Sequence, residues 1–394
     1  MTLASTSSAQ LAYIEEATYG VTPGSGTATS LRMTGESLAY DITRNESQEI
    51  NSTRQVSSSA QTSASLAGGI NLEFSYREYD PFLEALMSST FTTFGTDGVK
   101  DAVALTFVGQ TVTAPAATFT GLSDGQWISL TGAAPTTDNT GFYRIATWTS
   151  DAEVILDDAT PLADAIGADY AISHSELAVG VETLRSFSIE RQLTDVTQFF
   201  NNTGVTMTKL DLSFDTGAIV GGSFNCIGKA ADRAGVSGLP SAPEASQAYG
   251  MINAVSGVGS ILVDNTTTLL GTSVKSMKVS IDAKSRALTA IGSLGNIGVA
   301  NGTFAIGGSL EIYLEDGSVY DKALSDTYVS IQFPVYDTAG NGYVFVFDNC
   351  KLGVPQVTAG ARDQDVMMSV DFTAEAPASS TDKMLKIYRC GVAA

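Results

Sequence analysis

Few side chains in this sequence could form a catalytic or metal-binding site. His174 is the single histidine, so a Ser-His-Asp or Cys-His mechanism would have to use it. No nucleophile motif accompanies it, and we expect an ordinary, partly exposed histidine. Cys226, Cys350 and Cys390 are odd in number and far apart, which is typical of reduced thiols and not of a zinc site or a disulfide framework.

Adjacent acidic residues and glycine-rich turns are the remaining candidates for chemistry. Neighbouring residues of a strand point to opposite faces of a sheet, so adjacent carboxylates do not form a shared acid–base site. Three such pairs occur: Glu15-Glu16, Asp157-Asp158 and Glu315-Asp316. The turn at 337–342 lacks the spacing of a calcium loop, and Gly221-Gly222 lacks the lysine and helix of a phosphate loop. The sequence therefore predicts no catalytic residue, no metal site and no cofactor, and we do not expect an enzyme.

The composition argues against a protein that grips nucleic acid. The 394 residues include 42 acidic and 21 basic side chains, a net charge of −21, and the basic residues are not clustered. Only 16% of the residues are charged, which is typical of crowded β-rich assemblies with surfaces of Ser, Thr, Asn, Gln and Gly. We expect no signal peptide, because the first residues lack a basic segment followed by an apolar one. No apolar stretch approaches the ~20 residues of a membrane helix, so no membrane partner is expected.

Alternating hydrophobic residues dominate the chain and predict a mainly β fold. The clearest alternation covers the segments 38–42, 70–76, 187–189, 210–214, 277–281, 310–314 and 344–349. Asp-Gly and Asn-Gly turn signals lie between these segments. Helices are few. The best candidate begins at Asp80-Pro81, where Asp80 can cap the helix and an apolar face follows from Phe82 to Met87.

Two copies of one strand pattern follow each other along the chain. Residues 37–42 resemble 276–281, and the strand after Gly68-Gly69 resembles the strand after Gly307-Gly308, at a nearly constant separation. We therefore predict two tandem domains, and a Gly- and Pro-rich linker between them. The predicted division is 1–90 with 181–232 for the first copy, 91–180 for an inserted small all-β domain, 233–249 for the linker, and 250–394 for the second copy.

The N-terminal region carries a recognisable phrase, Glu-x-Thr-Tyr-Gly-x-Thr-Pro, at residues 16–23. Further short phrases follow in order at 31–38, 69–76, 79–86, 187–191, 198–200 and 217–224. This ordered series resembles the major tail tube proteins of long-tailed, siphovirus-type bacteriophages. The resemblance implies two tandem tail-tube β-sandwich or barrel domains, each with a short helix, which join edge to edge. Two copies per chain suggest a ring of three chains with pseudo-sixfold symmetry.

The resemblance also implies a function, partners and a location. Stacked rings would form a hollow tube that conducts DNA from the capsid to the host cell. The partners would be further copies of the chain, the tape measure protein, the tail terminator and the distal tail proteins, while double-stranded DNA passes through the lumen without specific binding. The protein would lie in the virion tail after assembly in the host bacterial cytoplasm. The inserted domain departs from the family pattern, and we expect it on the outside of the tube.

Two sets of residues are predicted to act in such a tube. The polar stretches 45–67 and 287–303 are long for hairpin turns and are expected to reach the next ring. The proposed contact residues are Asn45, Glu49, Arg54, Gln55, Ser58, Arg286 and Asn296. Acidic residues on the inner strands are expected to face the lumen and repel the like-charged DNA. These are Glu73, Asp211, Asp215 and Glu311.

Two other functions fit a β-rich chain of this size. A secreted or phage-tail adhesin that binds a receptor is the main alternative, and a secreted form would need an export signal, which we do not find. A polysaccharide-degrading tail enzyme would need clustered carboxylates and aromatic residues along a groove. Only two tryptophans occur, both within the predicted insert. Tubes or rings of the purified chain would favour the tube subunit over both alternatives.

Overall fold

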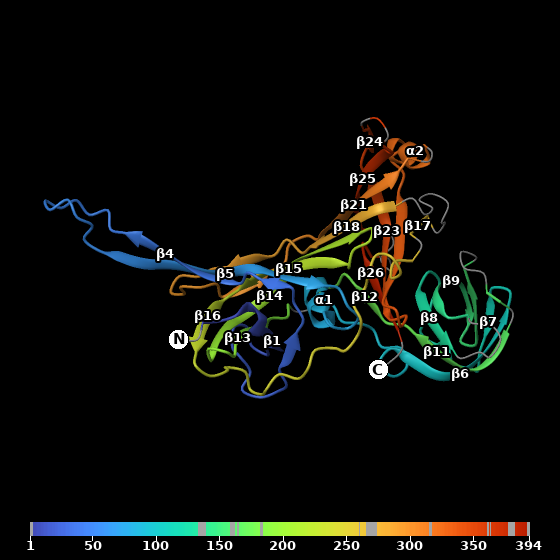
Figure 1. Cartoon of the computed structure of the whole chain (residues 1–394), viewed down its shortest axis with the longest axis horizontal. Coiled ribbons are helices and arrows are strands. Elements are labelled where there is room, and N and C mark those ends of the chain that lie inside the picture. The colour runs from blue at the N-terminus through green and yellow to red at the C-terminus, as the bar shows by residue number, and fades with distance from the viewer. Residues whose placement is uncertain are drawn as a thin grey trace.

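The computed structural model describes residues 3–132, 139–157, 162–163, 165–181, 184–259, 261–264, 274–314, 317–360, 362, 364–376 and 383–391. Strands dominate these residues, with two short α-helices, α1 (Asp80–Met87) and α2 (Ser318–Leu324), and a 3-10 turn at Thr6–Ser8. Figure 1 shows a body that carries a long hairpin arm, a second strand-rich unit that rises from it, and a small barrel beside the second unit. The mainly β fold class predicted from the alternation is confirmed.

One antiparallel sheet runs through both copies of the repeat, and we call it the inner sheet. Its strands follow the order β4–β5–β15–β14–β18–β21–β25–β24. The bounds are β4 (Ala39–Glu46), β5 (Ser59–Glu73), β15 (Gly221–Gly228), β14 (Gln198–Asp215), β18 (Val274–Asp282), β21 (Ala305–Tyr313), β25 (Val366–Ala374) and β24 (Gln356–Ala359), with the two-residue β3 (Gly35–Glu36) also paired to β5. The first copy supplies β4 to β14 and the second supplies β18 to β24, so one strand pairing, β14–β18, joins the copies.

The two copies repeat the same local arrangement. In each copy the first strand pairs with the second, a short helix follows, and the last inner strand lies next to the second strand. Gly68 and Gly308 mark equivalent places. A Cβ at Gly68 would clash with the carbonyl oxygen of Ser37, and a Cβ at Gly308 would clash with that of Lys278. Glycine at both places therefore allows the first two strands of each copy to approach closely.

A second layer covers the apolar face of the inner sheet. In the first copy it consists of β1 (Ala9–Glu15), β2 (Thr29–Leu31), β13 (Phe187–Leu193), β16 (Ala230–Ala234) and the first half of β14. In the second copy it consists of β17 (Leu262–Val263), β22 (Val329–Tyr336), β23 (Gly342–Leu352) and β26 (Lys386–Cys390), to which β12 (Glu176–Ala178) also pairs. A single hydrophobic core runs through both copies.

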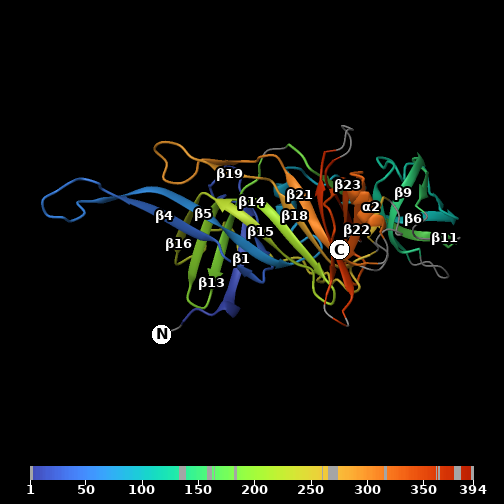
Figure 2. The ribbon, with the colours of Figure 1, turned by 90° about the horizontal axis from the view of Figure 1, so that it is seen from above.

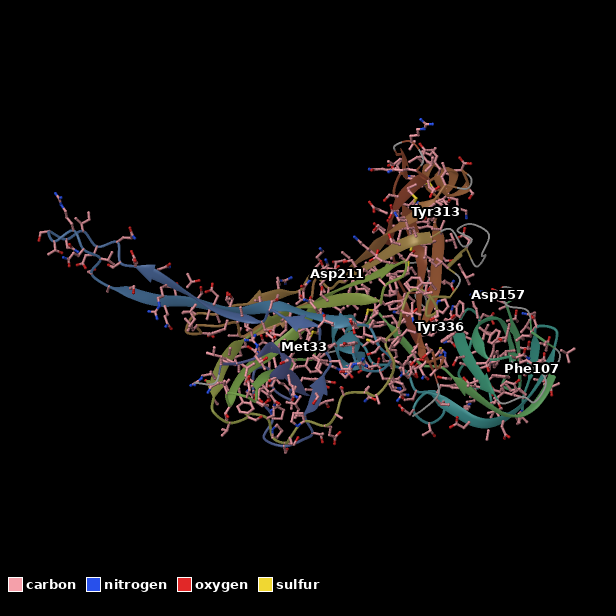
Figure 3. The ribbon with its side chains drawn as sticks, in the orientation of Figure 1. Met33, Phe107, Asp157, Asp211, Tyr313 and Tyr336 are labelled. Carbon is pink, nitrogen blue, oxygen red and sulfur yellow. The ribbon has the colours of Figure 1, made fainter. Side chains whose placement is uncertain are left out.

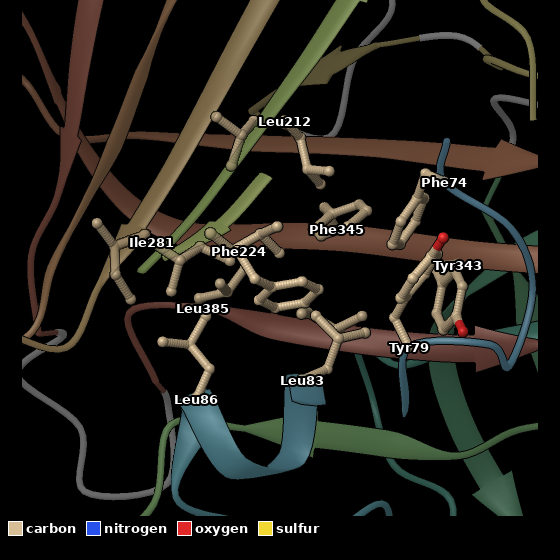
Figure 4. Packing of buried hydrophobic residues seen from close by; sticks show 14 of the residues in the cluster. Phe74, Tyr79, Leu83, Leu86, Leu212, Phe224, Ile281, Tyr343, Phe345 and Leu385 are labelled. Atoms are coloured by element: carbon tan, nitrogen blue, oxygen red, sulfur yellow. The ribbon is translucent and has the colours of Figure 1, made fainter. Parts of the chain in front are cut away.

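Helix α1 lies against this core at the place where the two copies meet. Figure 4 shows Leu83 and Leu86 of α1 pointing toward Phe224 and Leu385. The helix begins at Asp80 and has Pro81 in its first turn, as the sequence indicated, but the cap residue is Tyr79 and makes no side-chain cap bond. The Asp80 carboxylate instead accepts hydrogen bonds from the Tyr343 hydroxyl (2.5 Å) and from Nη1 of Arg389 (2.6 Å).

The inserted residues form a closed six-stranded barrel with its own core. Its strands are β6 (Val99–Val108), β7 (Thr111–Thr113), β8 (Trp127–Gly132), β9 (Gly141–Ser150), β10 (Glu153–Leu156) and β11 (Ala165–Ser173). The two chain segments that connect the barrel to the body lie side by side, and the His174 N–H of one donates to the Gly98 carbonyl of the other (2.9 Å). Although it is inserted into the first copy, the barrel contacts the second: Trp127 Nε1 donates to Gln332 Oε1 (2.9 Å), and the Phe142 ring stacks on Tyr336 at 5.2 Å. Figure 3 places Tyr336 at this contact.

Two hairpins project from the same side of the body. The long arm is the β4–β5 hairpin, whose tip is the loop 47–58. The short arm consists of β19 (Arg286–Leu288), β20 (Gly298–Ala300) and the loop between them. Figure 2 shows the two arms side by side, and the Ala64 N–H of the long arm donates to the Leu294 carbonyl of the short arm (2.8 Å). The stretches expected to be loops, 45–67 and 287–303, thus contain strands at their ends.

Neither helix among the described residues is long and apolar enough to cross a membrane.

Candidate assembly surfaces

The histidine and the three cysteines are buried. His174 is only 4% exposed, so the expectation of a partly exposed histidine is wrong, and its Nδ1 lies 2.8 Å from the Trp127 carbonyl oxygen. Burial lowers the pKa of His174 and raises the pKa of the Cys226 and Cys350 thiols to about 12. Among the residues that the structure describes, no group of three His, Cys, Asp or Glu side chains could hold a metal ion. Asp158, Glu315 and Asp316 lie outside the described residues.

The inner sheet has one apolar and one polar face, and the four predicted lumen acids lie on the polar face. Along β14, Leu210, Leu212 and Phe214 are buried, so Asp211 and Asp215 between and after them point the other way. Strand register extends this face sideways. Asp211 lies opposite Ser223 and Ser280, Asp215 lies opposite Ser276, Ser276 lies opposite Glu311, and Glu73 lies opposite Gly221. Figure 3 shows Asp211 on this part of the sheet.

Lysines on or beside the polar face neutralise some of these acids. Lys209 Nζ lies 2.9 Å from Asp211 Oδ2, and Lys275 Nζ lies 3.3 Å from Glu311 Oε1. No ion pair is found for Glu73 or Asp215 among the described side chains. The face is therefore a mixture of neutral pairs, serines, single acids and the exposed Lys278. Sequence reasoning that counted only the acids missed the pairs. The Lys209-x-Asp211 spacing on one strand was the available signal, because residues two apart lie on one face.

The long arm carries five of the seven predicted contact residues on an exposed surface. Asn45 lies at the end of β4, while Glu49, Arg54, Gln55 and Ser58 lie in the tip loop, and all five are exposed. The tip has internal order of its own. The Ser47 N–H donates to the Ser58 carbonyl (2.9 Å), and Asn51 Nδ2 donates to the Gln55 carbonyl (2.7 Å).

The short arm holds the other two predicted residues, and they differ from each other. Arg286 is exposed on β19, whereas Asn296 is only 5% exposed. Asn296 Oδ1 accepts from the Tyr19 hydroxyl (2.7 Å), and its Nδ2 donates to the Gly228 carbonyl (2.9 Å). Its side chain therefore anchors the short arm to the first copy and does not face outward, because Tyr19 and Gly228 hold it from within. The apolar residues Leu288, Ile291, Leu294 and Ile297 are exposed on this arm instead.

The inner sheet ends in two strands with an unpaired edge. Among the described residues, β4 pairs only with β5, and β24 pairs only with β25. The side chains of both strands are exposed to solvent. All four residues of β24 are exposed, and all residues of β4 except Tyr40 are exposed. An unpaired strand edge presents free N–H and C=O groups to another chain. One molecule thus offers a free edge at each end of the inner sheet.

A family model described as "Phage tail tube protein" matches residues 6–374. The match covers both copies of the repeat and the barrel between them. No curated protein matches the chain. Because the family model spans nearly the whole sequence, the resemblance noted for the N-terminal phrases extends through the second copy, and the chain belongs to the phage tail tube proteins, a family of structural proteins of the virion tail.

Proposed function

We propose that this chain is the repeating subunit of the tail tube of a siphovirus-type phage, in which three chains form one ring of six equivalent inner-sheet units. The observation that carries the proposal is the β14–β18 pairing inside the chain. It joins β14, at the margin of the first copy's part of the sheet, to β18, the first inner strand of the second copy. The same connection between chains would use the two edges that remain free, on β24 and β4.

The twist of the sheet and the number of units would allow the ring to close. Neighbouring strands of a sheet are rotated by roughly 20–25° relative to each other, so a sheet of many strands curves. Closing the sheet on itself removes both free edges, which otherwise promote uncontrolled aggregation. An odd number of chains is compatible with this closure because each interface joins two different edges, as in head-to-tail rings. Three chains give six copies of the unit.

The two arms are proposed to connect one ring to the next. Both project from the same side of the body, and the long arm is exposed from Asp41 to Ser63 except for the half-buried Ser47 and Asn51. An exposed two-stranded ribbon is marginal on its own and gains stability when it packs against other strands. The exposed residues Asn45, Glu49, Arg54, Gln55 and Ser58 of the long arm, together with Arg286, are the proposed contacts. Asn296 supports the short arm from within.

The polar face of the inner sheet is proposed to line the lumen. Its apolar face is occupied by the core, so only the polar face is available to water and to passing DNA. The serines and lysine–carboxylate pairs offer no concentrated positive charge for phosphate groups. The single acids Glu73 and Asp215 add repulsion within about a Debye length, ~8 Å at physiological salt. DNA would then slide through without specific binding.

The barrel is proposed to lie on the outside of the tube. It contacts the second copy through Trp127 of β8, which donates to Gln332 of β22, and is followed by β12, which pairs with β26. Strands β22, β12 and β26 belong to the layer opposite the polar face. The division of the chain into residues 1–90 with 181–232, 91–180, 233–249 and 250–394 is retained as a proposal. The tape measure protein in the lumen, the tail terminator and the distal tail proteins at the two ends of the tube are the further partners that a tail tube requires.

Electron microscopy of the purified full chain tests the proposal. We expect hollow tubes or rings, and averaged end-on views with six similar inner units and three outer barrels per ring. Six barrels per ring would contradict the trimer, because each chain carries one barrel. A protein that stays monomeric at high concentration, and also in the presence of tail tips purified from the phage, would contradict the tube itself.

A further inference from the structure

The free edge is closed at Leu38, the residue just before β4, by two side chains. The Leu38 N–H donates to Glu36 Oε2 (2.9 Å), and the Leu38 carbonyl accepts from Arg191 Nη2 (2.9 Å). Arg191 also forms an ion pair with Glu36, with Nη2 at 2.8 Å from Oε2. We call Glu36 and Arg191 the Leu38 clasp. Both side chains are largely covered, 11% and 27% exposed, so solvent weakens their interaction less than it would on an open surface.

Leu38 is a residue whose backbone groups point away from its own sheet. The neighbouring Ser37 N–H donates to the Gly69 carbonyl of β5 (2.9 Å), which fixes the residues that bond inward. Inward and outward bonding alternate along an antiparallel strand, so Leu38 and Tyr40 direct their N–H and C=O groups to the outside. The clasp therefore occupies the backbone groups that a neighbouring strand would need.

The second copy shows what occupies the same place once a neighbouring strand is present. A Cβ at Gly68 would meet the Ser37 carbonyl, as a Cβ at Gly308 would meet the Lys278 carbonyl. Ser37 therefore corresponds to Lys278, and the next residue, Leu38, corresponds to Val279. Val279 pairs with Leu212 of β14, and the described side chains form no clasp there. The residue that corresponds to Glu36 is Met277, which is 1% exposed and lies opposite Phe214. The carboxylate of Glu36 thus lies at the free edge of the first copy, whereas the apolar Met277 lies at the equivalent place in the second copy, where β14 is paired.

The opposite free edge offers a matching residue. Val357 lies opposite Met368 on β25, just as Leu212 lies opposite Gly222 on β15. Val370 lies opposite Leu310 of the second copy as Phe224 lies opposite Ile70 of the first. Val370 therefore corresponds to Phe224, and Met368 corresponds to Gly222, two residues earlier in each strand. The Gly353 N–H donates to the Asp371 carbonyl (2.7 Å), and Gln356 lies opposite Ser369, so alternation turns the Val357 backbone outward. Val357 is 47% exposed.

We propose that Val357 of one chain pairs with Leu38 of the next chain, and that this pairing displaces the Leu38 clasp, which holds the edge closed in the free subunit. The inference rests on the proposed ring. It assigns the partner as a second copy of this chain and fixes the register, with Gln356 opposite Ala39 on the polar face. The clasp slows ring closure because its charged hydrogen bonds must be given up before the strand bonds form.

The first test compares the rate of tube formation in three variants of the full chain. Arg191→Met keeps the apolar stem and removes the clasp donor, and it should shorten the lag of spontaneous tube formation by about tenfold or more. Glu36→Gln keeps an acceptor for Leu38 but loses the ion pair, and it should shorten the lag less. The control is Arg185→Met, which removes a similarly covered ion pair with Glu84 away from this edge, and its lag should equal that of the unaltered chain. An unaltered lag in Arg191→Met overturns the clasp.

The second test measures the register directly. Ala39→Cys combined with Gln356→Cys should give disulfide-linked chains in assembled tubes, with the largest covalent species a closed ring of three, because both side chains face the lumen in a closely spaced pair. Tyr40→Cys with Gln356→Cys, on opposite faces, should give no such product. The three native cysteines are buried and do not compete. Tubes without the cross-link overturn the register and leave the tube function standing, whereas absence of tubes in the unaltered chain would contradict the tube function itself.

Discussion

Asp211 of β14 lies opposite Ser280 of β18, and these two residues belong to different copies of the repeat. Their pairing carries the polar face of the first copy into the second without a break. The apolar faces continue in the same way, since Leu212 lies opposite Val279 and both are buried. One chain therefore already contains the junction that a closed ring has to repeat between chains.

The single acids of the polar face give a prediction about DNA passage. Replacing both Glu73 and Asp215 with lysine should slow DNA ejection, because the new cations attract phosphate groups. The slowing should diminish at high salt. The measurement is the time course of DNA release from phage that carry the variant tube. Asp101→Lys, an exposed charge change on the barrel, is the control. Ejection at the unaltered rate in the double variant would remove the lumen assignment of this face.

The long arm gives a prediction about stacking. Replacing residues 44–62 with Asn-Gly would leave Thr43 and Ser63, which are paired in β4 and β5, on either side of a two-residue turn. Isolated rings without long tubes are expected, because the removed residues are exposed and contribute little to the fold of one chain. Deleting only 57–63 should act in the same direction.

Electron microscopy measures tube length in the arm variants, and thermal unfolding serves as the control. The unfolding temperature should stay close to that of the unaltered chain, since the replaced segment buries no core residue. Tubes of normal length would show that other surfaces connect the rings.

Local sequence patterns predicted the inner sheet well, because alternation on a strand is a direct consequence of one buried face. The segment 210–214 and the segment 277–281 both became central strands of this sheet. Patterns could not show that these two segments pair with each other, since register between distant strands depends on the whole fold. The polar stretch 45–67 carries no strand signal, because exposed strands on an arm have no buried face and hence no alternation.

The candidate site residues also differ in whether local sequence or distant contacts determine their exposure. Exposed positions such as Glu49 and Arg54 were placed correctly outside the core by their polar surroundings. Asn296 could not be placed from the sequence because its burial depends on Tyr19, which lies 277 positions away. The Leu38 clasp could not be found from the sequence for the same reason, as Glu36 and Arg191 belong to different segments of the first copy.

The contact between the barrel and the second copy gives a prediction about stability. Trp127 is 5% exposed and packs in a small cluster with Leu262, Val344, Val346 and Tyr388. Trp127→Ala should reduce the free energy of unfolding by about 3–5 kcal/mol, through the lost apolar contacts and the hydrogen bond to Gln332. Denaturant unfolding measures this loss. Trp148→Ala is the matched control in the same barrel, and because Trp148 is 36% exposed its effect should be clearly smaller. Equal losses would contradict a specific role of Trp127.

His174 gives a prediction about pH, because it is the single histidine of the chain. Burial lowers its pKa in the folded protein below the usual value near 6.5. The unfolded chain therefore binds a proton at a higher pH than the folded chain does, and stability contributed by neutral His174 is present above pH ~6.5 and lost as the pH falls below it. In that window the free energy of unfolding should fall by up to about 1.4 kcal/mol per pH unit through this group. His174→Asn can retain a donor for the Trp127 carbonyl and cannot titrate, so the difference between its unfolding curve and that of the unaltered chain, measured from pH 7.5 to 5.5, isolates the effect. Identical pH slopes would mean that His174 is reached by water and protonates in place.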